Sequence, residues 1–234
     1  MTVAVLSAIA RPILEPRLPD WIEPRWFETT EELMAVVDQG EIGWFDLYKK
    51  EDMAEAARRA VRMKWLNSIY AGLEHMPLSL LQERGVAVTN GAGINAITIA
   101  EYVVMGMLTV AKGYREVVHA QDRHEWLMDS PGKRELYGSK ALLLGMGAIG
   151  SLIAERLAPF GVEVTKVRRT PGPDSLAPDA WRARLGEFDW VILAVPATPE
   201  TDGMIGAAEL AAMKSDAVLL NIARGTVVDQ DALV

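Results

Sequence analysis

Three glycines at a fixed spacing are the clearest candidates for chemistry in this chain. They belong to a G-x-G-x-x-G hexapeptide that reads Gly145, Met146, Gly147, Ala148, Ile149, Gly150. In a strand–turn–helix unit this spacing permits a tight turn, lets the backbone approach a pyrophosphate, and lets helix and strand pack closely. The N–H groups that begin such a helix attract the anion. We therefore expect these six residues to bind a dinucleotide; the alternative is a purely structural glycine turn.

The segments on both sides of the hexapeptide fit a dinucleotide site. An apolar, strand-like run at residues 141–144 precedes it, and a helical pattern at residues 151–160 follows it. Gly161 then opens a second strand at residues 162–167. Because the motif binds phosphates in this order of elements, the context favours the site over the structural turn.

The residues after the second strand predict which dinucleotide is bound. An NAD site carries an Asp or Glu about 20 residues past the glycines, where it binds the ribose 2′-hydroxyl. Here that place holds Arg168, Arg169 and Thr170. Guanidinium groups suit a 2′-phosphate, which they bind through paired hydrogen bonds. We expect NADPH, with NADH as the alternative cofactor; a solvated basic turn is the alternative interpretation of the arginines.

Further blocks of sequence carry recognisable patterns. They are Ser-Ile-Tyr-Ala-Gly-Leu-Glu-His at 68–75, Leu-Ala-Val-Pro-Ala-Thr-Pro-Glu-Thr at 193–201, and Asn-Ile-Ala-Arg-Gly-Thr-Val-Val-Asp at 221–229. With the hexapeptide, they make the chain resemble the D-isomer-specific 2-hydroxyacid dehydrogenases, of the glyoxylate/hydroxypyruvate reductase type. The resemblance runs from about Ser68 to the last residue, and the preceding segment joins by position alone.

The resemblance implies that hydride passes between a nicotinamide and C2 of a 2-oxo or 2-hydroxy acid. It makes Arg224 the catalytic residue that grips the substrate carboxylate and polarises the carbonyl, a task suited to a fixed, permanently charged fork of donors. A surface arginine after a strand is the alternative. The cofactor would be lined, besides the glycines and Arg168 to Thr170, by Val195, Pro196, Thr201, Ile222, Ala223 and Arg224.

The 68–75 block resembles the turn that binds the substrate carboxylate in this family. Ala71, Gly72 and Leu73 would offer backbone N–H groups to it, a role that depends on conformation more than on side chains. Tyr70 stands where the family often has a small residue. It either narrows the substrate pocket or simply packs.

The resemblance also implies an acid–base histidine and a partner glutamate that come after the arginine block. We expect both beyond residue 234, because the chain ends within an expected helix and is interpreted as truncated. His75, His119 and His124 are interpreted as structural or solvated, since none follows a strand close to Arg224 in the sequence pattern.

Strands that alternate with helices predict an α/β fold with a doubly wound parallel sheet. We expect a Rossmann-type dinucleotide-binding domain at residues 93–234 and a smaller, flavodoxin-like substrate domain at residues 1–92. A helical pattern from Asn95 to about Gln121 predicts one long helix, whose apolar stretch at 101–110 suits a buried interdomain helix or a subunit contact. Residues 122–138 read as an arm, and both features resemble dimerisation elements of the family, so we expect a homodimer.

Composition restricts the remaining possibilities. The chain has 234 residues, half of them hydrophobic, and a mean hydropathy of +0.10, as in a soluble globular protein. It shows neither an apolar run of membrane-spanning length nor an evident signal peptide, so we expect a cytoplasmic protein. Without cysteine it forms no disulfides, and we expect no metal. The net charge of −8 argues against nucleic-acid or membrane partners.

Two other functions stay open at this point. One is a non-catalytic dinucleotide-binding or scaffold protein of the same fold. The other is a dehydrogenase of the same architecture that acts on formate or phosphite, because a fold does not determine the substrate.

Overall fold

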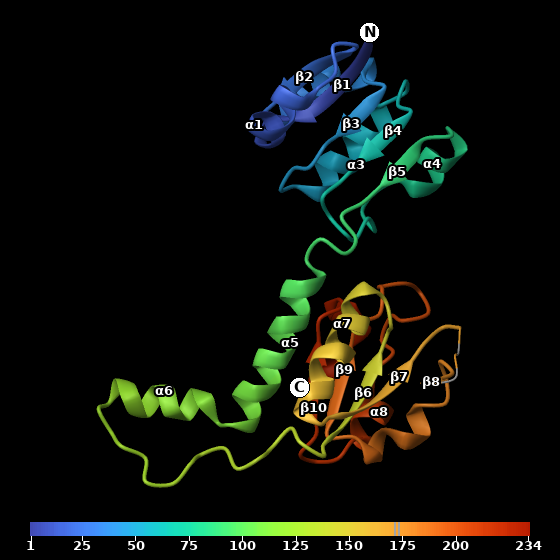
Figure 1. The fold of residues 1–234 in the computed structure, drawn as a ribbon. Coiled ribbons are helices and arrows are strands. Elements are labelled where there is room, and N and C mark those ends of the chain that lie inside the picture. The colour runs from blue at the N-terminus through green and yellow to red at the C-terminus, as the bar shows by residue number, and fades with distance from the viewer. Residues whose placement is uncertain (171, 173) are drawn as a thin grey trace. The chain divides into compact units, whose positions relative to one another are not determined.

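The computed structural model describes residues 1–170, 172 and 174–234. The chain divides into two compact units, Met1–Ile94 and Asn95–Val234, and each is described by itself (Figure 1).

Unit 1 is built on one parallel sheet. Its strands are β1 (Thr2–Ser7), β2 (Ile22–Phe27), β3 (Ile42–Trp44), β4 (Trp65–Asn67) and β5 (Ala87–Thr89), in the spatial order β2-β1-β3-β4-β5. Its helices are α1 (Arg11–Leu14), α2 (Thr30–Val36), α3 (Lys50–Arg59) and α4 (Leu78–Glu83). This strand order is the flavodoxin-like one, which confirms the predicted fold of this part.

Strand β2, like helix α1, is an element of unit 1 that the sequence pattern did not predict. Its sequence, Ile-Glu-Pro-Arg-Trp-Phe, carries charges and a proline in place of an apolar run. The strand pairs with β1 alone and forms an edge of the sheet. An edge tolerates a proline, because one row of its backbone groups needs no partner strand.

Unit 2 is a second parallel sheet. Its strands are β6 (Lys140–Leu144), β7 (Glu163–Val167), β8 (Ser175–Leu176), β9 (Trp190–Leu193) and β10 (Val218–Asn221), in the order β10-β9-β6-β7-β8. Its helices are α5 (Ala96–Ala111), α6 (Tyr114–Asp122), α7 (Ala148–Leu157), α8 (Ala207–Ala212) and α9 (Gln230–Leu233). The chain proceeds outward from β6 to β8 and then returns to β9 on the other side of β6. This doubly wound order confirms the predicted Rossmann-type sheet.

Both faces of the second sheet are buried. Ala141 and Leu143 of β6 pack into one apolar cluster with α5 and α7, while Leu142 and Leu144 pack into another with Trp181 and Phe188. Alternate residues of a strand point to opposite faces, so a strand covered on both sides must be apolar throughout. This is why the run before the glycines carries no polar alternation.

The single long helix predicted from Asn95 to about Gln121 is wrong. The structure has two helices, α5 and α6, bent by 70° at a break that contains Gly113. Gly113 adopts φ 59°, and a Cβ there would lie 2.9 Å from the backbone nitrogen of Gly132. A left-handed residue ends a helix, and here the returning arm packs against the corner. Periodicity alone did not reveal this break.

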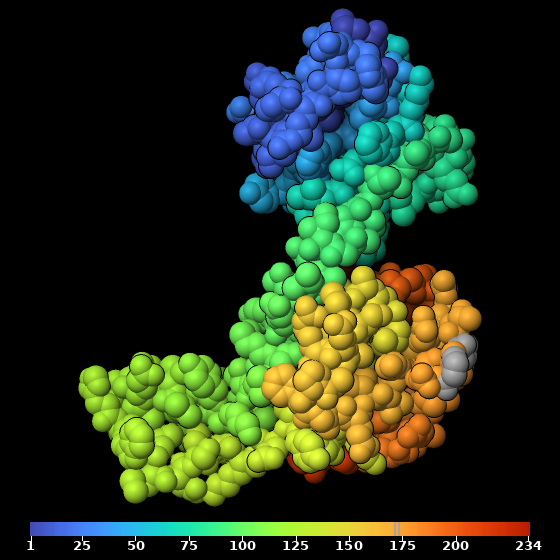
Figure 2. Space-filling model, viewed as in Figure 1, coloured from blue at the N-terminus to red at the C-terminus, as the bar shows by residue number. Residues whose placement is uncertain are grey.

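Helix α6 and the arm (residues 122–138) extend from the rest of unit 2 (Figures 1 and 2). Among the described helices, none by itself is long and apolar enough to cross a membrane, and α5 with α6 passes that test only as the bent pair.

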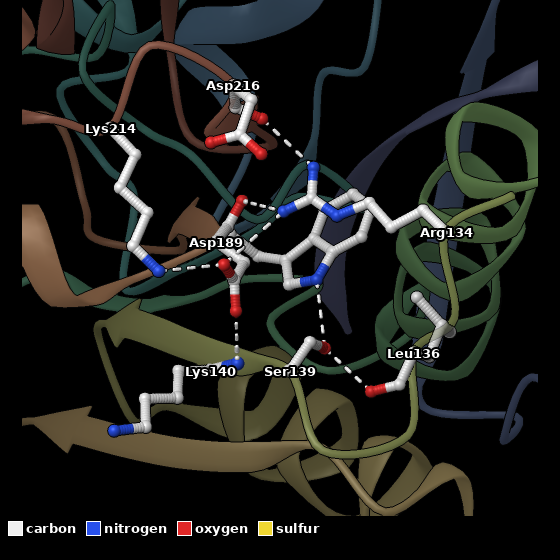
Figure 3. A network of polar contacts seen from close by, with 8 residues as sticks. Arg134, Leu136, Ser139, Lys140, Asp189, Lys214 and Asp216 are labelled. Atoms are coloured by element: carbon white, nitrogen blue, oxygen red, sulfur yellow. Dashed lines mark hydrogen bonds and ion pairs between the residues drawn. The ribbon is translucent and has the colours of Figure 1, made fainter.

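A polar network ties the end of the arm to the amino ends of the strands (Figure 3). The carboxylate of Asp189, just before β9, accepts hydrogen bonds from the Lys140 backbone N–H at 2.8 Å and from Lys214 Nζ at 2.9 Å. Arg134 of the arm lies 3.6 Å from the same carboxylate, and its guanidinium lies over the Trp190 ring. The network therefore anchors the arm at the edge of the sheet opposite to the glycine turn.

Candidate functional site

The carboxyl ends of four parallel strands meet at one edge of the second sheet. Leu144 of β6 pairs in register with Val167 of β7 and Leu193 of β9, and Leu193 pairs with Asn221 of β10. The segments that follow these strands begin at Gly145, Arg168, Ala194 and Ile222. Open α/β sheets bind ligands at this edge, where the strand order reverses. The structure thus brings the cofactor residues predicted in unit 2 to one edge.

Gly145 and Gly150 are required by the local geometry. Gly145 has φ 100°, and a Cβ there would lie 2.5 Å from the carbonyl oxygen of Ala194. A Cβ on Gly150 would lie 2.0 Å from the Gly145 carbonyl oxygen. These positions admit only glycine, because the turn passes against the end of β9 and α7 packs directly onto the turn.

Gly147 is different, because a Cβ there would meet no described atom within 4 Å. It is the residue before α7, and the N–H groups of Gly147, Ala148 and Ile149 have no acceptor among the described residues. Open space beside unpaired donors at a helix N-terminus suits the pyrophosphate of a dinucleotide. The residues present therefore fit such a cofactor.

Arg168, Arg169 and Thr170 follow β7 and are exposed. The Arg168 backbone N–H donates to the Leu176 carbonyl oxygen at 3.2 Å. In the described part of the chain, neither guanidinium lies within ion-pair distance of a carboxylate. The pKa of Glu200 is lowered, first by its hydrogen bond with Thr198 and to a smaller extent by the positive charge of Arg169. Both guanidinium groups are thus available to a ligand.

The hydroxyl of Thr201 makes hydrogen bonds that stabilise the loop after β9. The Thr201 hydroxyl accepts a hydrogen bond from the Thr198 backbone N–H at 2.9 Å and donates to the Pro196 carbonyl oxygen at 2.6 Å. Val195 and Thr201 are half-buried, and Pro196 is exposed. Thr201 therefore shapes the loop, and its hydroxyl is already engaged.

Arg224 stands on a turn held by Asn221, the last residue of β10. The Asn221 side chain accepts from the Ala223 backbone N–H at 3.0 Å and donates to the Arg224 carbonyl oxygen at 2.8 Å. The exposed guanidinium of Arg224 also donates to the Ala223 carbonyl oxygen at 2.8 Å. The Ile222 backbone N–H continues the pairing with Leu193 at 3.2 Å. Asn221 belongs to the block that contains Arg224, but only the structure shows that it fixes the turn.

The predicted substrate-binding residues lie in a turn after β4, residues 68–73, called the 68–73 turn. The N–H groups of Ala71, Gly72 and Leu73 have no acceptor among the described residues. The carbonyl oxygen of Ala71 accepts from Asn90 Nδ2 at 2.7 Å. The turn thus presents backbone donors at the carboxyl edge of the first sheet, the arrangement that binds anions.

The side chain of Tyr70 packs into unit 1. It is half-buried, its hydroxyl donates to the Leu47 carbonyl oxygen at 3.2 Å, and its ring meets that of His75 edge-on with centroids 6.4 Å apart. These contacts favour the interpretation that the Tyr70 ring packs within unit 1. That the ring narrows the substrate pocket stays a prediction.

The three histidines have different surroundings. His75 is half-buried, and neither ring nitrogen has a hydrogen-bond partner among the described residues. Burial first, and then the charge of Lys50, lowers the pKa of His75. His119 and His124 are exposed on and just after α6. The described residues include no group of three or more His, Asp or Glu side chains placed to hold a metal ion.

Comparison with known proteins gives one family. A model described as "D-isomer specific 2-hydroxyacid dehydrogenase, NAD binding domain" matches residues 104–234. Among solved structures, the TT0316 protein from Thermus thermophilus is similar over the whole chain and 77% of its own, with 30% identity and a TM-score of 0.78.

Two similar relatives are named for activities. The D-3-phosphoglycerate dehydrogenase of Mycobacterium tuberculosis is 27% identical over the whole chain, and the glyoxylate/hydroxypyruvate reductase B of Yersinia enterocolitica is 30% identical over 87% of the chain. The chain spans 45% of the length of the first relative and 64% of the second.

Proposed function

The chain belongs to the family of D-isomer specific 2-hydroxyacid dehydrogenases, and from that premise we propose that it transfers hydride between NADPH and a small 2-oxo acid in the cytoplasm. Glyoxylate and hydroxypyruvate are the proposed substrates. The observation that carries the proposal is the position of Arg224, an exposed guanidinium on a fixed turn at the same sheet edge as the glycine turn.

The proposed cofactor site combines the glycine turn with the end of β7. The open space at Gly147 and the unpaired N–H groups at the N-terminus of α7 would take the pyrophosphate. Arg168 and Arg169 would take the 2′-phosphate, because no carboxylate occupies the place that binds a ribose 2′-hydroxyl in NAD sites. NADH is the alternative, and the family model itself is named for NAD binding.

The proposed chemistry divides between cofactor and chain. When bound, the reduced cofactor supplies the hydride. The Arg224 fork holds the substrate carboxylate and donates to the carbonyl oxygen, which stabilises negative charge as it develops there. The N–H groups of Ala71, Gly72 and Leu73, and the neighbouring Tyr70, are proposed to contribute to binding of the carboxylate.

The proton donor is not assigned to a histidine of these 234 residues. Burial lowers the pKa of His75, whose ring meets that of Tyr70 edge-on, while His119 and His124 are exposed on the arm side of unit 2. We propose that none of them is the acid–base group. That this histidine and its glutamate lie beyond residue 234 stays a prediction.

We also propose a homodimer. Helix α5 buries one face through Ala100, Val103 and Met107, but Tyr102 and Met105 on other faces are 67% and 50% exposed. Met105 also lines a groove beside α5 and α7, whose walls are mainly apolar but include Glu101, Lys112, Glu155 and Arg156. A contiguous apolar patch is rare on monomers, and a second copy that applies the same patch would cover it.

The proposed function is tested by the oxidation of NADPH, followed at 340 nm with glyoxylate and with hydroxypyruvate, in a chain that includes the expected acid–base histidine and glutamate, because these 234 residues are not proposed to supply the proton donor. Arg224→Lys keeps the charge but loses the planar fork, so we expect kcat/KM to fall about 10²–10³-fold. Arg115→Lys, on the exposed face of α6, is the matched control and should leave the rate unchanged. NADPH titrations of the same proteins check that the cofactor site is intact. Tight NADPH binding without turnover of either acid would favour the non-catalytic dinucleotide-binding protein.

A further inference from the structure

Asp46 is a buried carboxylate that the sequence analysis did not single out. It follows β3, is 7% exposed, and has no cation within ion-pair distance among the described residues. A buried carboxylate is costly unless hydrogen-bond donors surround it. The identity of those donors therefore indicates what the residue does.

The donors to Asp46 converge from the same strand and from the turn after the neighbouring strand. Ser68 Oγ donates to Oδ1 at 2.6 Å, and the Ile69 backbone N–H donates to Oδ2 at 2.7 Å. Trp44 Nε1 also donates to Oδ2. Because β3 and β4 are parallel neighbours, Asp46 and Ser68 leave the sheet side by side. Asp46 thus binds the first two residues of the 68–73 turn.

Ser68 links the Asp46 carboxylate to the backbone of Tyr70. While Ser68 Oγ donates to Asp46, it accepts from the Tyr70 backbone N–H at 3.1 Å. The Tyr70 hydroxyl donates a hydrogen bond to the carbonyl oxygen of Leu47, the residue after Asp46. The backbone N–H groups of Ile69 and Tyr70 are therefore both hydrogen-bonded within the protein. The next three, at residues 71–73, have no acceptor among the described residues.

From this geometry we infer that Asp46 is a positioning residue for substrate binding: its carboxylate fixes the 68–73 turn in the conformation that presents three free N–H groups to the substrate carboxylate. The inference rests on the proposed function, because it takes that turn as the substrate-binding segment. Asp46 does not touch the substrate. It acts through Ser68 and Ile69.

The chemistry requires aspartate at this position. An ionised carboxylate is acceptor-only, so it receives the indole, hydroxyl and backbone donors together. In Asp46→Asn one oxygen becomes an NH₂ group, which faces either the Ile69 N–H or the Ser68 hydroxyl. Facing the Ile69 N–H, the NH₂ group sets donor against donor; facing Ser68, it reverses that hydrogen bond, so either orientation disturbs the contacts that hold the turn.

The test uses oxalate as a planar, unreactive probe of the 2-oxo acid site, with isothermal titration of the protein in the presence of NADP⁺. We expect Asp46→Asn to weaken oxalate binding about tenfold and to leave the NADPH dissociation constant within about twofold, since the cofactor residues lie in the other unit. Asp52→Asn is the matched control: its carboxylate accepts from Thr30 Oγ1 at 2.8 Å in the same unit but does not touch the turn. It should bind oxalate like the wild type.

A second pair of variants covers the case in which Asp46→Asn does not fold. Ser68→Ala removes the relay to the Tyr70 N–H but leaves the bond from Ile69 to Asp46, and Ser68→Thr keeps the hydroxyl. We expect Ser68→Ala to weaken oxalate binding and Ser68→Thr to restore it, which general destabilisation would not produce.

The possible results distinguish a failure of the positioning role of Asp46 from a failure of the proposed function. If the wild type binds oxalate and Asp46→Asn and Ser68→Ala bind it equally well, the role of Asp46 is overturned and the proposed function stands. If the wild type binds NADPH but neither oxalate nor glyoxylate, the proposed substrate class fails, and the role of Asp46 fails with it.

Discussion

At the scale of single residues, Gly147 and Gly150 of the glycine turn differ in whether a side chain would fit. A Cβ on Gly150 would lie 2.0 Å from a backbone oxygen, whereas a Cβ on Gly147 would enter open space. The first glycine is therefore required by the fold. The second is required only if a ligand occupies that space, which makes the pair a test of the cofactor site.

We expect Gly147→Ala to leave the melting temperature nearly unchanged and to weaken NADPH binding by tenfold or more, since the added methyl would meet only the pyrophosphate. Gly150→Ala should destabilise unit 2 by about 1–3 kcal/mol through overpacking. Thermal unfolding and NADPH fluorescence titration of both variants separate the two effects. Unchanged NADPH affinity in Gly147→Ala would remove the pyrophosphate from this turn.

Cofactor choice also belongs to the residue scale. Arg168 and Arg169 are exposed, and each charge-assisted contact with a 2′-phosphate is worth about 1.5–3 kcal/mol. We expect NADPH to bind more tightly than NADH, and Arg168→Asp to shift the preference toward NADH. Arg184→Asp, which breaks an exposed ion pair with Glu187 in the same unit, is the control and should not alter the ratio. Equal dissociation constants for the two cofactors in the wild type would contradict the assignment.

At the scale of elements, the arm is attached to the sheet by charge as well as by packing. Burial raises the pKa of Asp189, but hydrogen bonds from the Lys140 N–H and Lys214, with the charge of Arg134, outweigh it and lower the pKa below its ordinary value. A carboxylate with a depressed pKa in the folded state stabilises the fold above its ordinary pKa. That contribution is lost as pH falls through the lower, folded value.

We therefore expect Asp189→Asn to lower the free energy of unfolding by about 1–3 kcal/mol at pH 7, because the Lys140 backbone N–H and the Lys214 ammonium lose their charged partner. The difference from wild type should begin to shrink below about pH 4, where Asp189 becomes protonated in the unfolded chain, and should shrink further as pH falls toward the lower pKa of the folded state. Asp129→Asn breaks an ion pair whose side chains are 70% and 81% exposed, so it should cost little. Urea unfolding at pH 7 and pH 3.5 measures both. A difference that does not depend on pH would rule out the charge as its cause.

At the scale of the whole molecule, the proposed homodimer would cover the exposed apolar side chains of α5. We expect light scattering at micromolar concentration to give the mass of a dimer. Met105→Asp should shift it to the monomer, because a charge would then lie in the proposed contact. Val61→Asp changes an apolar side chain of similar exposure in unit 1 and should leave the dimer intact. A monomer mass for the wild type would count against the assembly.

Several elements of the fold follow from local sequence. Strands β6 and β7 lie at or close to the expected segments, residues 141–144 and 162–167, because short apolar runs between turn residues specify buried strands. Edge strand β2 was not predicted, since its middle positions hold a proline and charges in place of an apolar run. The bend at Gly113 was missed because the apolar periodicity continues across it and the contact with Gly132 is not local.

By itself, the sequence determined the place of the glycine turn, the two-sheet α/β class and the family, because glycine spacing, apolar runs and the arginine block are properties of short segments. Tertiary structure alone decided which strands are neighbours, and hence that the ends of β6, β7, β9 and β10 form one edge. It also decided the role of Asp46, whose partners Ser68 and Ile69 are 22 and 23 residues away. A carboxylate in a sequence does not show which donors will surround it, because those donors come together only when β3 and β4 pair.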